Sequence, residues 1–441
     1  MKKLSLLFLL ITILITGLIT WATIQDHQGI ISTKGLRTSV ENMDVNSIAT
    51  WIPKSEIGIN QLILKGPPLE RGYAAGKLTQ KILYAQEKSL VTIFDAFLPN
   101  PVLRRAFIIG LTWWFSGIEN YFEPETLEEM YGVSLSTSPE FNRLADPFTR
   151  QVAYHGLHEV GQMLIDNQVD VMGCTLFALP YKNSWVIGRN FDFEAGRIFD
   201  EEKIMKWVFP EHGNAFVSVT WAGMVGVVTG VNEQGVYISL NAAGSDDFKR
   251  LGTPSTLVIL KALMFANTAD QARKIIEAAP MFITDIFVVV DKTGQAYRIE
   301  KSPKKFVSIP LHEASVITNH LIGKIWAFDK TNEQRKKKNT TLFRAERGEV
   351  LLRENKNNKT DNHRLLLSFL RDKQDENAHS LSHSIDSRVT SHSVIYDAPQ
   401  NLLYVSQGPG LAGKFFGFNL KKSFQEMKPV AADVLAAEEH P

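Results

Sequence analysis

The chain contains a single cysteine, Cys174, in the segment Met172-Gly173-Cys174-Thr175. One thiol cannot form a disulfide within the chain, and a thiolate metal cluster needs more than one cysteine. Two interpretations remain: a small buried hydrophobic residue, which is the commoner fate of a free cysteine, or a nucleophile. A cation and a carboxylate, Arg189 and Asp192, follow in Gly188-Arg189-Asn190-Phe191-Asp192 and favour the nucleophile.

Cleavage of the chain between Gly173 and Cys174 would place a thiol and a free α-amine on the same residue. An α-amine has a pKa near 8, so it can accept the thiol proton directly or through water. Such a site needs no catalytic histidine. The glycine before the cysteine leaves room for the thiol to attack the preceding carbonyl. The same group would thus cut its own chain and later attack a substrate.

The order of several motifs resembles the N-terminal nucleophile (Ntn) hydrolases. Within them, the segments 66–76 and 221–236 are more similar to the acyl-CoA:6-aminopenicillanic acid acyltransferase group than to the choloylglycine hydrolase and acid ceramidase group. The resemblance covers roughly residues 66–408 and is firmest over 172–320. The motifs that carry it are Gly173-Cys174-Thr175, Gly188-Arg189-Asn190-Phe191-Asp192, Ser239-Leu240-Asn241 and Thr318-Asn319-His320.

The resemblance assigns roles to the residues nearest the thiol. Cys174 would be the nucleophile and, through its α-amine, the general base, with self-cleavage between Gly173 and Cys174. Arg189 would favour the thiolate by its charge, and Asp192 would orient the α-amine. Arg189 and Asp192 lie three residues apart and point to opposite faces of a regular strand. We therefore expect a turn or bulge that brings both to one site.

Three later residues complete the predicted site. The resemblance implies that Asn241 helps to form an oxyanion hole and that Asn319 belongs to that hole or orients the substrate. Each asparagine also has a plain structural reading, because Asn241 can end a strand and Asn319 can sit in a turn. The family also has a later arginine near the site, and Arg388 is the candidate for it.

The implied fold is α+β, an αββα sandwich of two antiparallel sheets between helical layers, built mainly by residues 174–330 and a hairpin at 393–406. Alternating apolar residues and turn signals predict strands along this region, with a helical stretch at 253–279. Residues 56–173 read as a helical propeptide that becomes the small chain after cleavage. Gly72 and Gly76 there indicate close helix packing. Residues 174–441 form the catalytic domain, with a polar helical insert at about 329–387, in which the basic run Arg335–Lys338 is expected to be solvated surface rather than a binding patch.

The N-terminus begins Met1-Lys2-Lys3 and continues as an apolar stretch from Leu4 to Ile24. This stretch is long enough to cross a bilayer as a helix, and the lysines favour a cytoplasmic N-terminus. Residues 1–25 are therefore predicted to be a signal-anchor, with a cleaved signal peptide or a buried helix as alternatives. Residues 26–55 would be a tether. The protein is expected to be extracytoplasmic and membrane-anchored, or secreted if the segment is cleaved.

The formal net charge of +1 gives no sign of a nucleic-acid partner. No Walker loop, dinucleotide fingerprint or His-Glu-x-x-His pair is present in the sequence, so no cofactor or metal is predicted. The predicted reaction is hydrolysis of a linear N-acyl amide through an acyl-thioester on Cys174. The alternatives are an acyl-CoA-dependent acyltransferase, an amidase for ceramide-like or N-acylethanolamine-type lipids, and an inactive membrane-tethered binding protein. The oligomeric state is left open.

Overall fold

The computed structural model describes residues 31–40, 43–156, 159, 172–338, 340–358, 361–373, 384–408 and 413–435. The predicted signal-anchor at 1–25 and the chain at 160–171, just before the predicted cleavage point, lie outside these residues. None of the helices in the described part of the chain combines the length and the apolar character needed to cross a bilayer.

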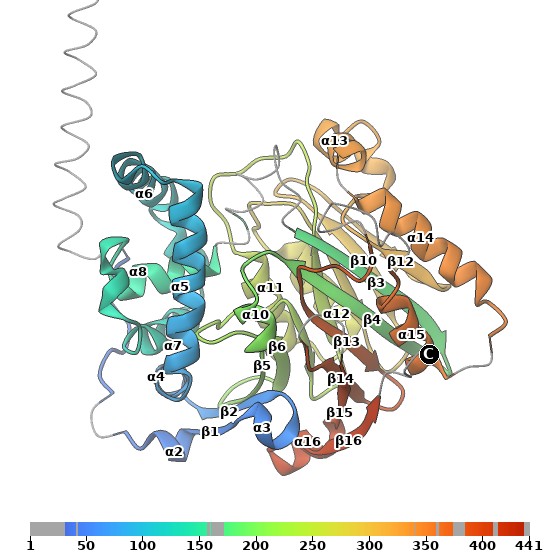
Figure 1. Cartoon of the computed structure of the whole chain (residues 1–441), viewed down its shortest axis with the longest axis horizontal. Helices are drawn as coiled ribbons and strands as arrows, with labels where there is room; N and C mark the ends of the chain where they lie inside the picture. Colours follow the sequence, from blue (N-terminus) through green and yellow to red (C-terminus); the bar gives the residue numbers. More distant parts are fainter. Residues whose placement is uncertain are drawn as a thin grey trace, which may run out of the picture.

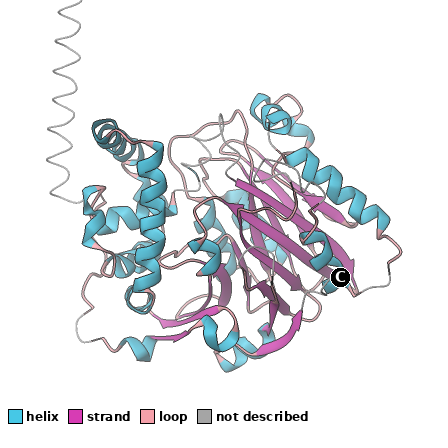
Figure 2. Cartoon of the chain, in the orientation of Figure 1, coloured by secondary structure: helices cyan, strands magenta, loops and turns pink. Residues whose placement is uncertain are grey.

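Two β-sheets stack face to face, and helices cover the outer side of each (Figure 2). The space between the sheets is filled by large apolar side chains, among them Trp207, Tyr237, Val288 and Val394. The four-layer αββα arrangement predicted for this region is therefore present.

The first sheet has nine strands in the order β1-β2-β5-β6-β7-β8-β9-β10-β11. Its neighbours are antiparallel except for β2 and β5, which run parallel. The prediction of purely antiparallel sheets was wrong at this pair, because β2 comes from the predicted propeptide and joins the sheet from outside the catalytic domain. The strands are β1 (Ala49–Ile52), β2 (Asn60–Gly66), β5 (Ile204–Pro210), β6 (Phe216–Thr220), β7 (Thr229–Asn232), β8 (Tyr237–Ala242), β9 (Asp285–Val290), β10 (Ala296–Lys301) and β11 (Phe306–Pro310).

The second sheet has seven antiparallel strands in the order β12-β3-β4-β13-β14-β15-β16. Its centre is the hairpin of β3 and β4 together with β13, which carries a bulge between Thr390 and His392. The strands are β3 (Met172–Tyr181), β4 (Ser184–Phe193), β12 (Ser315–Ile317), β13 (Thr390–Asp397), β14 (Leu402–Ser406), β15 (Phe415–Asn419) and β16 (Ala431–Leu435).

One helical layer, α11 (Ser255–Phe265) and α12 (Ala269–Ala278), covers the nine-stranded sheet. The sequence predicted one helical stretch at 253–279, and the structure divides it. Thr268 caps the N-terminus of α12, since its side chain accepts a hydrogen bond from the Gln271 N–H. The fold thereby turns the chain and lays both helices on the same sheet.

The predicted insert at 329–387 supplies the helical layer on the seven-stranded sheet. Helices were expected near Leu351 and Leu365, and they are α14 (Thr341–Glu354) and α15 (Asn362–Leu370), preceded by α13 (Lys330–Lys338). The basic run Arg335–Lys338 was expected to be solvated surface, and this was wrong for Arg335, because that side chain is buried. The inner face of the insert is buried as well. Leu366 is fully buried against Gly188 of β4, where a Cβ would lie only 3.1 Å from the leucine.

The N-terminal helices stand together beside the sandwich (Figure 1). Helix α4 (Pro68–Leu78) packs against α7 (Pro124–Ser134) so closely that a Cβ on Gly72 would lie 1.9 Å from the Glu129 carbonyl oxygen. This confirms the close packing indicated by Gly72 and Gly76. The remaining helices are α2 (Val45–Ile48), α3 (Lys54–Ile57), α5 (Gln80–Phe97), α6 (Pro101–Phe115), η1 (Ile118–Tyr121), η2 (Pro139–Arg143), α8 (Pro147–His155), α10 (Ile198–Glu201), η3 (Lys324–Trp326) and α16 (Leu420–Glu426).

The segment before the sandwich is less separate than the sequence suggested. The predicted tether at 26–55 contains β1, and Ile31 is already buried. The predicted helical propeptide at 56–173 contains β2, which is paired with β5 along seven residues. A backbone ladder thus joins the two predicted chains, and it would hold them together after a cut at Gly173.

Candidate active site

The β3–β4 hairpin fixes the position of Cys174. The two strands pair so that Cys174 lies opposite Phe191 and Gly173 lies opposite Asp192. Directly opposite residues share a face of the sheet. Cys174 therefore projects toward the nine-stranded sheet, whereas Asp192 projects toward the α14 side. The Gly173–Cys174 peptide bond, the predicted cleavage point, therefore lies in β3 with Asp192 on one side of the sheet and the Cys174 side chain on the other.

The backbone of Cys174 is held on both sides by side chains. Its N–H donates to Asn319 Oδ1 at 2.7 Å, and its carbonyl oxygen accepts from Arg344 Nη1 at 2.6 Å. Arg344 Nη2 also donates to Asn319 Oδ1 at 2.8 Å. All three residues are buried, so these bonds form out of contact with solvent. The nitrogen that would become the α-amine is already in a fixed hydrogen bond in the uncut chain.

The thiol lies beside a buried cation. Arg189 Nη2 is 3.7 Å from Cys174 Sγ, and the guanidinium carbon stands 4.9 Å from the centre of the Phe191 ring. Arg189 reaches this position by donating to Thr229 Oγ1 and to the Leu240 carbonyl oxygen, both in the nine-stranded sheet. Burial raises the pKa of the Cys174 thiol, and the charge of Arg189 opposes that rise.

Asp192 lies at the same junction from the opposite face of the sheet. Its Oδ1 accepts from Thr390 Oγ1 at 2.6 Å, while its Oδ2 is buried without a hydrogen-bond partner in the described part of the chain. That free oxygen lies 3.0 Å from where a Cβ on Gly173 would stand. Burial raises the pKa of Asp192 to about 6, against the opposing charge of Arg344. The expected turn or bulge in β4 is absent, since β3 and β4 pair in continuous register. Arg189 and Asp192 therefore approach the junction from opposite faces of the sheet.

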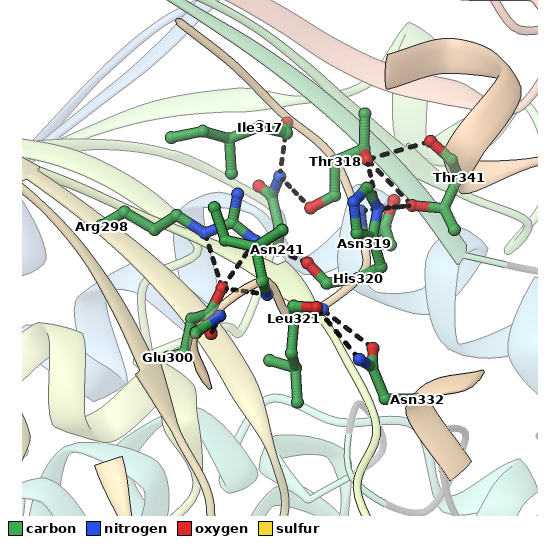
Figure 3. A network of polar contacts seen from close by, with 12 residues as sticks. Asn241, Arg298, Glu300, Ile317, Thr318, Asn319, His320, Leu321, Asn332 and Thr341 are labelled. Carbon is green, nitrogen blue, oxygen red and sulfur yellow. Dashed lines mark hydrogen bonds and ion pairs between the residues drawn. The ribbon is translucent and has the colours of Figure 1, made fainter. Parts of the chain in front are cut away.

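The two predicted asparagines are linked through the segment after β12 (Figure 3). Asn241 Nδ2 donates to the Ile317 and Thr318 carbonyl oxygens at 3.2 and 3.1 Å, and thus ties β8 to β12 of the other sheet. Asn319 Nδ2 donates in return to the Ala242 carbonyl oxygen at 2.9 Å. Both side-chain NH₂ groups are therefore engaged within the protein, and Asn319 is the residue whose amide oxygen contacts Cys174.

Further polar contacts fix the chain that follows Asn319. Arg298 pairs with Glu300 and donates to the His320 carbonyl oxygen, and Asn332 makes two hydrogen bonds to the backbone of Leu321. The Glu300 carboxylate also accepts from two backbone N–H groups just beyond. Figure 3 shows these contacts around the turn. They hold the turn that presents Asn319 to the nucleophile.

The structure does not bring Arg388 to the other predicted residues. Arg388 is exposed in the turn before β13, whereas Arg344 is buried and contacts Cys174. Sequence reasoning missed Arg344 because it assigned no site residue to the charge-rich insert. A usable signal was present: Thr341, Arg344, Gly348 and Leu351 follow a helical spacing, and they are the buried residues of α14.

A second missed group supports Arg189. Arginine only donates hydrogen bonds, so Thr229 Oγ1 accepts from Arg189 and gives its own proton to His392 Nε2 at 2.9 Å. Burial keeps the pKa of His392 well below its ordinary value, so the imidazole is neutral. Its ring stacks on Phe191 at 5.1 Å. This chain of contacts holds the guanidinium beside the thiol.

A small cavity lies next to these aromatic rings. Its volume is about 110 Å³, and it is lined mainly by apolar side chains from the sandwich and the N-terminal helices. Phe191, the neighbour of Cys174 across the hairpin, forms part of the wall together with Phe193, Phe199, Trp221 and Val228. Within the described residues no group of three or more His, Cys, Asp or Glu side chains could hold a metal ion.

A family model described as acyl-coenzyme A:6-aminopenicillanic acid acyl-transferase matches residues 180–410, just over half of the chain. The matched region begins after Cys174 and includes Arg189, Asp192, Asn241 and Arg344. No curated protein matches the chain.

Three of the solved structures that match the chain come from Caenorhabditis elegans, Agrobacterium tumefaciens and Clostridium perfringens. The N-acylethanolamine-hydrolyzing acid amidase ortholog of Caenorhabditis elegans has 16% identity and a TM-score of 0.38, over 51% of this chain and 93% of that chain. Penicillin V acylase from Agrobacterium tumefaciens has 18% identity and a TM-score of 0.37, over 53% of this chain and 82% of that chain. A mutant conjugated bile acid hydrolase from Clostridium perfringens has 13% identity and a TM-score of 0.38, over 59% of this chain and 96% of that chain.

Proposed function

Because the chain belongs to the acyl-coenzyme A:6-aminopenicillanic acid acyltransferase family, and its relatives are amide hydrolases and acyltransferases, we propose that it is a self-cleaving cysteine Ntn hydrolase. The observation that carries this proposal is the arrangement at the Gly173–Cys174 junction. A buried carboxylate oxygen without a partner lies beside Gly173, and a fixed hydrogen bond holds the Cys174 nitrogen. A free α-ammonium group is a suitable partner for that oxygen.

Maturation begins with the thiol. The charge of Arg189, 3.7 Å from the sulfur, favours loss of the thiol proton. Asp192 lies at Gly173 on the other face of the sheet with its pKa raised to about 6, and its ionised form would pair with the α-ammonium group that cleavage creates. Once deprotonated, Cys174 Sγ attacks the Gly173 carbonyl carbon, and the carbon–nitrogen bond breaks as the Cys174 nitrogen takes up a proton. Water then hydrolyses the thioester, which leaves a Gly173 carboxylate and a free Cys174 with its α-amine. Arg344 and Asn319 hold the backbone of Cys174 during these steps.

Turnover reuses the same atoms. The α-amine takes the thiol proton, the thiolate attacks the amide carbonyl of a substrate, and Arg189 stabilises the negative sulfur. The α-ammonium then protonates the leaving amine as an acyl-thioester forms. Water releases the acyl group as a carboxylic acid and restores the thiol. An amine in place of water would make the same enzyme an acyltransferase.

The substrate class that we propose is a linear N-acyl amide with an apolar acyl group. The cavity beside Phe191 supports this choice, since most of its surface is apolar, although Glu87 and His155 also line it. Amide-linked lipids belong to this class. We further propose that the enzyme acts outside the cytoplasm, anchored or secreted through residues 1–25, because Lys2 and Lys3 precede an apolar stretch.

The test is the intact mass and N-terminal sequence of the purified protein beside its Cys174→Ala variant. We expect a large fragment that begins Cys174-Thr175, which the variant lacks. Arg388→Ala is the matched control, because it changes an exposed residue of the same domain and should cleave normally. A single uncut chain for the unaltered protein, or cleavage in Cys174→Ala, would disprove self-cleavage by the thiol. If the uncut chain hydrolysed N-acyl amides, the enzyme activity would not depend on cleavage at Gly173–Cys174.

A further inference from the structure

Large apolar side chains are exposed at one end of the molecule. Helix α6 has no buried residue along its whole length, and Val102, Leu103 and Trp113 are all exposed on it. Phe248 and Phe328 are exposed in two loops, and the side chain of Phe328 is 95% exposed. An isolated exposed apolar residue needs no explanation, but a group of them marks a contact surface.

Direct contacts join these segments into one continuous surface, which we call the docking face: α6 with residues 244–252 and 320–338. The Trp114 and Phe248 rings lie 6.1 Å apart, and Arg250 donates to the Trp114 carbonyl oxygen at 2.5 Å. Asp246 accepts from the Lys330 N–H at 2.9 Å. Figure 1 shows α6 and α13 at the same end of the molecule, with loops between them.

The charge of the docking face is positive. Segment 320–338 contains six lysines and arginines against two acidic residues, and α6 contains Arg104 and Arg105 without any acidic residue. The intervening loop 244–252 carries Asp246 and Asp247 against Lys249 and Arg250, so it adds no net charge. Asp246 is engaged with the backbone of Lys330 and with Thr331. Exposed apolar side chains among cationic ones match the interface of an anionic bilayer.

The N-terminal chain independently points to a bilayer at this end. Ile31 is buried, and it lines a cavity together with Ile108, Leu111 and Phe115 of α6. Only residues 25–30 separate it from the apolar stretch that the sequence predicts to span a membrane. Six extended residues reach roughly 20 Å at most. A membrane-spanning segment at 4–24 would therefore keep α6 close to the bilayer surface.

We propose that the docking face binds the surface of a bilayer that contains anionic lipids. The two loops of this face directly follow Asn241 and Asn319, so the surface borders the candidate active site. A lipid-borne amide would then meet the enzyme at the side where the site lies. The proposal concerns membrane contact and stands whether or not the thiol is catalytic.

The single cysteine makes a clean experiment possible. Cys174→Ala removes the only thiol of the full chain, so a cysteine introduced at Phe328 or Leu103 can be labelled alone with an environment-sensitive fluorophore. Lys421→Cys, exposed on α16 at the other end of the molecule, is the matched control. The probes are vesicles of phosphatidylcholine with and without phosphatidylglycerol.

We expect the emission at positions 328 and 103 to rise and shift to shorter wavelength with phosphatidylglycerol vesicles, and less so at high ionic strength. The label at 421 should not respond. Equal responses at 328 and 421 would overturn the proposal. A shift at 328 that appears without vesicles and grows with protein concentration would also overturn it, because it would identify a contact between copies of the chain. Fluorescence does not depend on turnover, so failure here is distinct from failure of the proposed enzyme function.

Discussion

Arg344 makes the sharpest test of the site, because sequence reasoning overlooked it and the structure places it against the nucleophile. Its guanidinium donates to the Cys174 carbonyl oxygen, Thr175 Oγ1 and Asn319 Oδ1 at 2.6, 2.8 and 2.8 Å. Arg344→Ala would leave these buried acceptors without a charged donor. A buried acceptor left without its donor costs about 1–3 kcal/mol of folding stability.

The effect on cleavage follows from geometry and charge. Loss of the bond to the Cys174 carbonyl frees the junction, and a displacement of about 1 Å costs roughly a hundredfold in rate. Arg344 is also the strongest charge that lowers the pKa of Asp192. Its removal raises that pKa above about 6, so Asp192 ionises at higher pH. The pH profile of cleavage should therefore move toward higher pH as well as fall in rate.

The assay follows the appearance of the fragment that begins at Cys174 by mass spectrometry over time and across pH. Arg344→Lys tests geometry, since it keeps the charge but loses the forked donor. It should retain the pH profile while cleaving slowly. Arg388→Ala is the control, because the same change is made at an exposed position. If Arg344→Ala cleaves at the normal rate with an unshifted profile, Arg344 does not position the junction.

Three further predictions concern the surroundings of the site. In the Cys174→Ala background, Asp192→Asn should remove a pH dependence of the folding stability. A carboxyl whose pKa is raised to about 6 in the folded chain favours folding at low pH, and about 3 kcal/mol of stability is lost as the pH rises through 6. Denaturant unfolding at several pH values would reveal this slope. Gly72→Ala should lower the melting temperature and cost about 1–3 kcal/mol or more, because its Cβ would lie 1.9 Å from a backbone oxygen. Gly110→Ala is the control and should stabilise α6, because no atom lies within 4 Å of its Cβ. Equal effects of the two substitutions would contradict the packing argument. Thr229→Val keeps the side-chain shape but removes the hydroxyl between the Arg189 and His392 side chains, so it should cost about 1–3 kcal/mol of stability and slow cleavage. Normal cleavage would show that Arg189 needs no support from Thr229.

Local features of the sequence were enough to predict the centre of the fold. The β3–β4 and β9–β10 hairpins were expected near their observed positions, because alternating apolar residues are interrupted by turn residues. Gly294, at a φ of 95°, closes the second hairpin in a conformation that favours glycine. The approximate positions of Cys174 and Asp192 followed from the same hairpin. These features depend on neighbours in the sequence, so a single sequence reveals them.

Features that depend on distant partners were missed. Strand β2 pairs in parallel with β5, more than a hundred residues away, and neither strand was predicted. The apolar run of β5 is interrupted by Lys206, which is buried and donates to the Met224 carbonyl oxygen at 2.7 Å. Arg344 is a comparable case, because its burial depends on the Cys174 and Asn319 acceptors. Whether a charge is buried is decided by such partners and not by local composition.

The arrangement around Cys174 supports the proposed reaction on the chain itself over a role in packing alone. A cysteine kept only as a small hydrophobic residue would need apolar neighbours, and Phe191 and Leu240 would suffice. Here the residue is surrounded by Arg189 at the sulfur and Arg344 at the carbonyl, both buried, and Asp192 has an unpaired oxygen at the preceding glycine. Buried charges without full pairing are costly to a fold, and they concentrate where a reaction uses them. Cleavage would convert the Cys174 nitrogen from an amide into a cation, and the unpaired carboxylate oxygen would then gain the partner that the uncut chain does not provide.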